Sequence, residues 1–150
     1  YEVLYETNWK TMSERLKKDV NLESFSEMLK EQGYDPSISV GAFDTEPGEC
    51  VSLVLNSFRK DKEKTAYDII TCTIPEYRRM GIARTIFEKV KVLLKERGIE
   101  IYTTETKRDN IIAQNMYRSL GFEITNEVVT TLKTLNGSRQ VEQYEVVMKL

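Results

Sequence analysis

The chain has 150 residues, enough for one domain that buries its core without metal or disulfide support. Its formal net charge of −2 gives no global positive field for a nucleic acid, and no apolar run approaches the roughly 20 residues of a membrane span. These features predict a single domain over residues 1–150 and exclude nucleic acid and membrane as default partners.

Two residue types limit the chemistry. Cys50 and Cys72 are the two cysteines and form no CxxC pair, which favours a reducing cytoplasm and gives no thiolate metal site. The sequence has no histidine, so the commonest general base and metal ligand is missing. An enzyme with this sequence would use carboxylates, tyrosines, lysines or water, and we predict no metal.

The first predicted elements are two short helices within residues 7–33. Apolar residues recur at three- and four-residue spacing at Trp9, Met12 and Leu16, and the pattern repeats in a second helix that Gly33 ends. Three strand-like runs follow, rich in β-branched residues: Ser37–Phe43, Cys50–Phe58 and Thr65–Ile74. Their short polar connectors predict an antiparallel meander.

A helix and a strand alternate twice in the middle of the chain. Ile82 to Gly98 carries an apolar stripe opposite Lys, Arg and Glu, which predicts an amphipathic helix. Ile99–Thr106 reads as a strand, and Asn110–Phe122 as a short helix that Asn110 caps. The order implies a parallel crossover from Thr65–Ile74 to Ile99–Thr106.

The last section holds two long β-type runs around Asn136-Gly137, a dipeptide typical of hairpin turns. The predicted order is ααβββαβαββ. It indicates a mixed α/β fold in which helices cover both faces of a largely antiparallel sheet with one parallel strand pair in the middle. Association of two copies through the hairpin or a sheet edge is a further hypothesis.

The most informative segment lies between the strand that ends at Ile74 and the amphipathic helix. It reads R-x-x-G-x-A from Arg78 to Ala83, which differs from both the GxxxxGK[ST] and the GxGxxG nucleotide motifs. A helix N-terminus carries unbonded N–H groups and partial positive charge, so arginines and Gly81 at that place predict a phosphate cradle. The alternative is an ordinary charged turn.

A second motif follows at Asn110–Phe122, where N-x-x-A-x-x-x-Y-x-x-x-G-F places Asn110, Ala113, Tyr117 and Gly121. With the Arg78–Ala83 segment and the order of elements, the chain resembles the GNAT superfamily, the GCN5-related N-acetyltransferases that bind acetyl-CoA. The resemblance extends over essentially the whole chain and implies the acyl-CoA N-acyltransferase fold, with its parallel strand pair splayed apart.

The resemblance also implies a cofactor site for acetyl-CoA, the cosubstrate. Backbone amides around Arg79–Arg84 would hold the pyrophosphate, and main-chain atoms at the end of the preceding strand would contact the pantetheine. Asn110 would cap its helix first and contact the cofactor second. The residues implied are Cys72, Thr73, Ile74, Arg78, Arg79, Met80, Gly81, Ile82, Ala83, Arg84 and Asn110.

Catalytic roles are implied for three residues. Tyr117 matches the tyrosine that would protonate the departing thiolate, although it could also be a packed helix residue. The base that deprotonates the amine is Glu105, which has the spacing to Tyr117 found in ribosomal-protein N-terminal acetyltransferases, or Asp68, an unusual carboxylate within an apolar strand. Tyr67 is a weaker candidate for the acceptor pocket.

The function that these residues imply is transfer of an acetyl group from acetyl-CoA to a primary amine of a small molecule or peptide, by direct attack in a ternary complex. Cys72 would lie near the thioester, so a covalent route in which its thiol is acetylated needs a test. The alternative is a non-catalytic domain that senses acetyl-CoA.

Overall fold

A six-stranded sheet forms the centre of the computed structural model, which describes residues 1–12 and 17–150. The strand order is β1-β2-β3-β4-β6-β5, so the last strand is inserted between β4 and β5. Only β3 and β4 are parallel. The strands are β1 Val40–Phe43, β2 Cys50–Phe58, β3 Thr65–Thr73, β4 Ile101–Lys107, β5 Glu123–Thr134 and β6 Gly137–Lys149. The predicted mixed α/β fold is confirmed.

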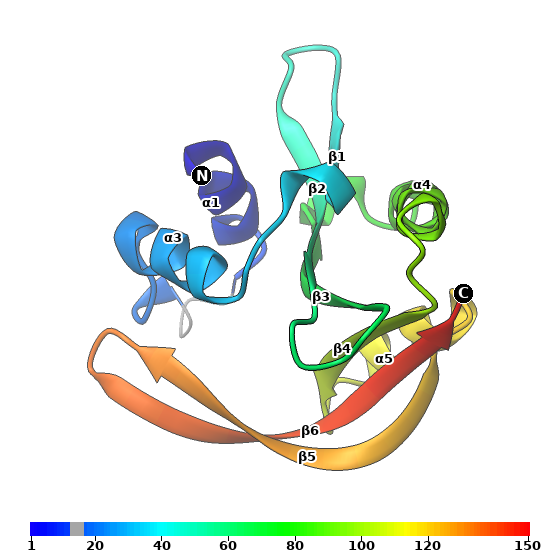
Figure 1. Cartoon of the computed structure of the whole chain (residues 1–150). Coiled ribbons are helices and arrows are strands. Elements are labelled where there is room, and N and C mark those ends of the chain that lie inside the picture. The colour runs from blue at the N-terminus through cyan, green and yellow to red at the C-terminus, as the bar shows by residue number, and fades with distance from the viewer. Residues whose placement is uncertain (13–16) are drawn as a thin grey trace.

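Helices cover both faces of this sheet (Figure 1). The first face carries α1 (Glu2–Trp9) and α3 (Leu22–Glu31), and the second carries α4 (Ile82–Glu96) and α5 (Ile111–Ser119). Two short 3-10 helices, Pro36–Ile38 and Pro75–Tyr77, precede β1 and the loop to α4. No helix in residues 1–12 and 17–150 has the length and apolar character that crossing a bilayer requires.

The N-terminus departs from the predicted helix, which was expected to begin near Thr7. The first helix instead ends at Trp9, and Leu16 lies outside the described residues. Its one buried residue is polar: the hydroxyl of Thr7 donates to the Val3 carbonyl and, at 3.3 Å, to the Cys50 carbonyl on β2. Besides this bond, α1 packs on the core through the adjacent residues Leu4 and Tyr5. Adjacent positions do not show helical spacing, so the pattern could not show where the helix begins.

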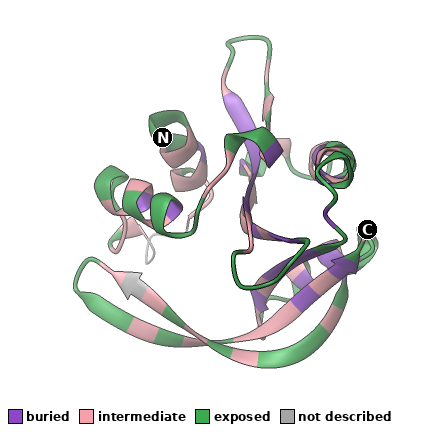
Figure 2. Ribbon diagram, in the orientation of Figure 1, coloured by how far each residue is buried: buried purple, intermediate pink, exposed green. Residues whose placement is uncertain are grey.

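The predicted C-terminal hairpin is confirmed, with its turn displaced by one residue. Thr134 pairs with Gly137, so Leu135 and Asn136 form the turn and Gly137 begins β6. The turn end of the hairpin curves away from the other strands and passes beneath α3 (Figure 1), and most of the hairpin is exposed or half-buried (Figure 2).

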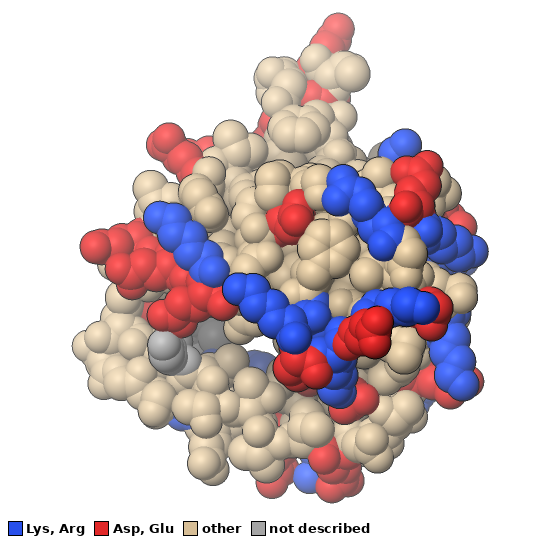
Figure 3. Space-filling model, viewed as in Figure 1, with Lys and Arg blue, Asp and Glu red and all other residues tan. Residues whose placement is uncertain are grey.

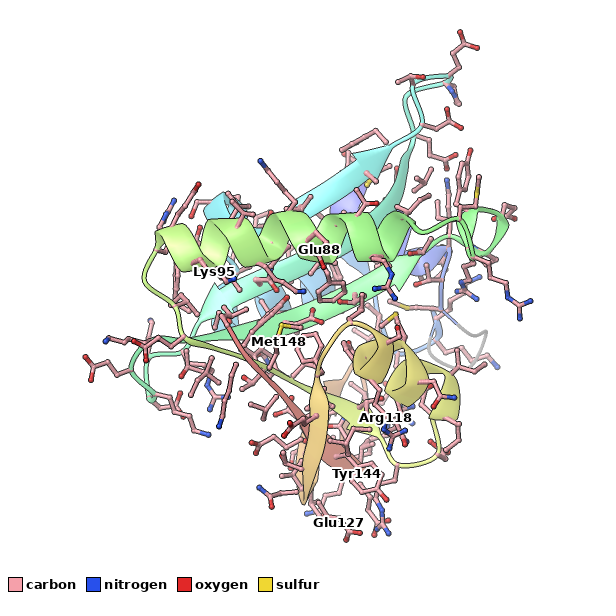
Figure 4. The ribbon with its side chains drawn as sticks, turned by 90° about the vertical axis from the view of Figure 1, so that its right-hand side faces the viewer. Glu88, Lys95, Arg118, Glu127, Tyr144 and Met148 are labelled. Atoms are coloured by element: carbon pink, nitrogen blue, oxygen red, sulfur yellow. The ribbon has the colours of Figure 1, made fainter. Side chains whose placement is uncertain are left out.

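The larger core lies between the sheet and the second helical layer. The stripe of α4 is buried at Ile86, Phe87, Val90 and Leu94. Figure 4 shows α4 crossing the sheet, with Met148 of β6 below it and its outer face turned to solvent. Predicted from periodicity, this helix forms as expected because burial of its apolar stripe stabilises it.

An aromatic cluster attaches α5 to this core. The ring of Tyr117 lies 5.3 Å from Phe122 and 6.4 Å from Phe87, both edge to face, and Tyr102 of β4 packs against the same two phenylalanines. These contacts fix the ring of Tyr117 in the core.

The strands β3 and β4 separate partway along their length. They pair only from Thr65–Tyr67 to Ile101–Thr103, and beyond this point the Thr104 hydroxyl donates to the Asp68 carbonyl at 2.9 Å. The predicted splay of the parallel pair is therefore present. It leaves backbone groups of β3 without a strand partner on that side.

A β-bulge in β3 changes which side chains reach each face. Asn56 pairs with Asp68 and Leu55 with Ile70, so Ile69 is the extra residue. Asp68 therefore faces the α4–α5 layer, whereas Ile70 packs in the cluster under α1 and α3. The bulge gives Thr71 the same face as Asp68.

Candidate active site

A cleft of about 900 Å³ opens where β3 ends, between the start of α4 and the exposed side of α5. Its volume is in the range of sites for small molecules and cofactors. Nine of the eleven predicted cofactor residues line it: Cys72, Thr73, Arg78, Arg79, Gly81, Ile82, Ala83, Arg84 and Asn110. The other two do not line it: Ile74 is buried and Met80 is 67% exposed.

The start of α4 in this cleft has no side-chain cap. Gly81 is the N-cap residue, and within residues 1–12 and 17–150 no side chain caps the first-turn N–H groups. Arg79 and Gly81 both have left-handed backbone conformations, with φ of +63° and +77°. Uncapped N–H groups at the positive end of a 15-residue helix form a site for an anion.

Gly81 combines a left-handed backbone with open space beside its Cα atom. Apart from Gly81 itself and its two chain neighbours, no atom of the described residues lies within 4 Å of a Cβ atom added there. The glycine is required by its φ of +77°, and the space beside it is open.

Three arginines contribute positive charge to this end of the cleft. Arg78 Nε donates to the Thr73 carbonyl at 3.0 Å and so lies against the end of β3. Arg84 donates to the Ser119 carbonyl at 3.3 Å and links the start of α4 to the end of α5. In the part of the chain that the structure describes, none of Arg78, Arg79 and Arg84 forms a salt bridge with a carboxylate.

Two predicted catalytic residues, Asp68 and Tyr117, are in contact below the cleft. Oδ2 of Asp68 accepts hydrogen bonds from the Thr71 hydroxyl at 2.6 Å and the Tyr117 phenol at 3.2 Å. Oδ1 is buried and has no partner among the described residues. Burial raises the pKa of Asp68 to about 7, against the two hydrogen bonds, which lower it.

The same burial acts on the phenol. Tyr117 is 7% exposed and does not itself line the cleft, but Thr71 does. Burial raises the pKa of Tyr117 well above its usual range, and the neighbouring Asp68 carboxylate raises it further. The phenol therefore keeps its proton at neutral pH.

The other predicted base, Glu105, is on the opposite face of the sheet. Successive strand residues alternate between faces, so Thr104 points with Asp68 and Glu105 points towards α1 and α3. Its Oε2 accepts a hydrogen bond from the Tyr67 phenol, and Glu145 of β6 is directly opposite it in the register. Burial and the Glu105 charge raise the pKa of Tyr67.

Glu105 is half-buried. Figure 3 shows that the surface is hollowed between α3 and the C-terminal hairpin. Charged side chains of both signs lie around this hollow. The structure thus places the two candidate bases on different faces of the sheet, and only Asp68 contacts Tyr117.

Several residues of the site were not predicted from the sequence. Thr71 and Thr104 bond to Asp68, but threonines within a strand read simply as strand formers. Ile112, 85% exposed, and Met116 add apolar surface to the cleft. Tyr77, directly before Arg78, lines the cleft and donates to Asp44 at 2.6 Å.

Solved acetyltransferases have the same fold as this chain. The chain aligns over its whole length with 92% of a chain in the crystal structure of the NatC complex bound to Gag peptide and CoA, with a TM-score of 0.73 and 17% identity. It aligns over 99% of its length with 92% of the PaiA N-acetyltransferase from Thermoplasma acidophilum in complex with coenzyme A, with a TM-score of 0.70 and 16% identity.

Curated relatives match a shorter segment. An aminoglycoside N(6')-acetyltransferase type 1 of Acinetobacter haemolyticus is 32% identical over 63 residues, 42% of this chain and 43% of the relative. Its counterpart from Acinetobacter baumannii is 34% identical over 62 residues, 41% of this chain and 42% of the relative. The chain thus spans less than half the length of these relatives.

The fold is that of N-acetyltransferases, and a family model identifies the class more closely. The model of the acetyltransferase (GNAT) family matches residues 1–122. The chain belongs to this family.

Proposed function

We propose that this protein transfers an acetyl group from acetyl-CoA to a primary amine, by direct attack while both substrates are bound. The observation that carries the proposal is the separation of β3 from β4 after Tyr67 and Thr103, beside the uncapped start of α4. The separated end of β3 offers unpaired backbone groups to an extended ligand, and the start of α4 offers N–H groups to the phosphates of that ligand.

In this proposal the cofactor lies along the 900 Å³ cleft. The amides of Arg79–Arg84 hold the pyrophosphate with Arg78 beside them, and the backbone of Cys72–Ile74 contacts the pantetheine. Met80 contributes its peptide group, since its side chain is exposed. Asn110 caps α5, because its side-chain oxygen accepts from the Ala113 N–H at 3.1 Å. When bound, acetyl-CoA supplies an activated acyl group with a thiolate leaving group.

Acid and base are assigned to opposite faces of the splayed strands. Glu105, half-buried and held by Tyr67, takes the proton from the incoming ammonium directly or through a water. Tyr117 gives a proton to the departing sulfur. We favour Glu105 over Asp68 as the base, because Asp68 is 1% exposed and its Oδ2 already accepts from Thr71 and Tyr117.

A covalent route through Cys72 has less support. Burial raises the pKa of its thiol to about 12. The nucleophile in such a route is the thiolate, which is scarce at neutral pH when the pKa is that high. Direct attack by the amine needs no such group.

The test is a CoA-release assay with acetyl-CoA and a panel of amines. The curated relatives are named for aminoglycoside acetylation, so aminoglycosides head the panel, followed by polyamines, amino acids and peptides with free N-termini. We expect release to exceed the no-amine rate with at least one class. Binding of acetyl-CoA, seen as a melting shift, without release for any class would overturn catalysis and favour the sensor.

A further inference from the structure

The hydrogen of the Tyr117 phenol points towards Asp68. A phenol has a single hydrogen, and the 3.2 Å contact to Oδ2 of Asp68 uses it. The hydroxyl of Thr71 likewise donates to Oδ2, at 2.6 Å. With Asp68 ionised, both hydroxyls direct their hydrogens inward, away from the cleft that Thr71 lines.

Protonation of Asp68 at Oδ2 reverses this arrangement. A protonated carboxyl donates one hydrogen, and the Tyr117 oxygen is within reach to accept it. The phenol hydrogen is then released for another acceptor. We propose that Asp68 is a positioning residue whose proton sets the direction of the Tyr117 hydrogen, so that Tyr117 can act as an acid only while Asp68 is protonated.

The inference rests on the proposed function, and its proton balance is complete. As the C–S bond breaks, its electron pair stays on sulfur, and Tyr117 gives the phenol proton to that sulfur. The proton of Asp68 moves onto the phenol oxygen in the same event. The products are a free thiol, a neutral phenol and an Asp68 carboxylate, which regains a proton from solvent before the next turnover.

The surroundings of Asp68 favour a proton on it. Asn56, opposite it on β2, is neutral, and no salt bridge to Asp68 occurs among the described residues. Burial in such a place penalises the charged form. The titratable side chains that act on it are phenols, a thiol and one carboxylate: Tyr117 of α5, Tyr102 and Glu105 of β4, and Tyr67 and Cys72 of β3.

The first test needs no turnover. The free energy of unfolding of the whole chain is measured with denaturant from pH 4 to pH 9. Ionisation of Asp68 should appear as a loss of stability with rising pH, and Asp68→Asn should abolish this loss. Tyr117→Phe removes a hydrogen bond that favours the carboxylate, so the midpoint of this loss should move to higher pH. Tyr102→Phe is the matched control, because Tyr102 packs on the same phenylalanines but donates to Asn56. An unmoved midpoint in Tyr117→Phe overturns the inference.

The second test uses turnover with the best amine, or the slow hydrolysis of acetyl-CoA if no amine reacts. We expect Asp68→Asn to lower kcat at least about tenfold at pH 6, to keep KM for acetyl-CoA within twofold, and to lose the alkaline fall of the wild-type pH profile. In a Tyr117→Phe background the same substitution should change kcat less than twofold.

The outcomes separate the two proposals. If Tyr117→Phe keeps full turnover, the acid assigned to the proposed function is wrong and the inference fails with it. If Tyr117→Phe is slow but Asp68→Asn keeps the wild-type kcat and pH profile, only the inference fails. A raised KM with an unchanged pH profile in Asp68→Asn indicates a structural role and also overturns it.

Discussion

The Tyr67 phenol donates a hydrogen bond to Oε2 of Glu105 across the one parallel strand pair, at the point where β3 and β4 begin to separate. This bond holds the carboxylate on the α1–α3 face, while the next residue of β3, Asp68, faces the opposite layer. The sheet therefore separates two carboxylates: Glu105 is half-buried and contacts Tyr67, and Asp68 is buried and contacts Tyr117.

Replacing Glu105 tests the assignment of the base. We expect Glu105→Gln to lower kcat about 10²- to 10⁴-fold, with little change in KM for acetyl-CoA, because the amide cannot accept a proton from the ammonium. Steady-state CoA release measures both constants. Glu100→Gln is the control, since Glu100 pairs with Lys64 at the surface before β4. Equal turnover of Glu105→Gln and wild type would show that another group is the base.

The two ends of α4 provide a matched pair of glycines for testing the anion site. Gly81 and Gly98 have φ of +77° and +72°. A Cβ atom added at either would meet no described residue within 4 Å other than its chain neighbours. Alanine at either position should cost roughly 1–2 kcal/mol of unfolding free energy, from the left-handed backbone. Only Gly81→Ala should also weaken CoA binding, measured by calorimetry. If both variants weaken CoA binding equally, the anion is not bound at the start of α4.

Asp68 should make stability fall with rising pH. Its pKa is raised from 3.8 to about 7 in the folded chain, so the fold favours the protonated form. That stability is complete below about pH 4 and is lost as the pH rises to about 7, by up to about 4 kcal/mol. In denaturant titrations, the free energy of unfolding of Asp68→Asn should rise relative to that of the wild type over this pH interval. A constant difference between the two proteins would mean that Asp68 stays ionised.

Cys72 should be dispensable for the chemistry. Because burial raises the pKa of its thiol to about 12, we expect Cys72→Ala to retain kcat within about threefold, with any loss arising from packing in the cleft. Rapid-quench mass spectrometry should detect no acetylated enzyme. Abolished turnover with intact CoA binding would instead support the covalent route.

The sequence predicted the elements whose partners are local. The stripe of α4, with a glycine at each end, and the cap of α5 by Asn110 depend on neighbours a few residues away, and both appear as expected. The start of α1 was not predicted, because the Thr7 hydroxyl of that helix contacts β2 through a hydrogen bond between residues distant in the sequence.

The site itself was only partly visible in the sequence. The loop and the α5 motif located the cleft, but the contact of Thr71 with Asp68 depends on the bulge at Ile69, which leaves no pattern in a β-branched run. The different faces of Asp68 and Glu105 follow from strand pairing between residues distant in the sequence. That pairing explains why the sequence alone could not assign the two carboxylates to different faces.

The most direct test of the account is to incubate the wild-type chain and two variants with acetyl-CoA and the amine panel, measuring acetylated amine by mass spectrometry beside released CoA. The account predicts equal amounts of both products for at least one amine. Their rate should fall at least about tenfold in Tyr117→Phe and hold in Tyr102→Phe. Bound CoA without acetylated amine from any class, or equal rates in the two variants, would contradict it.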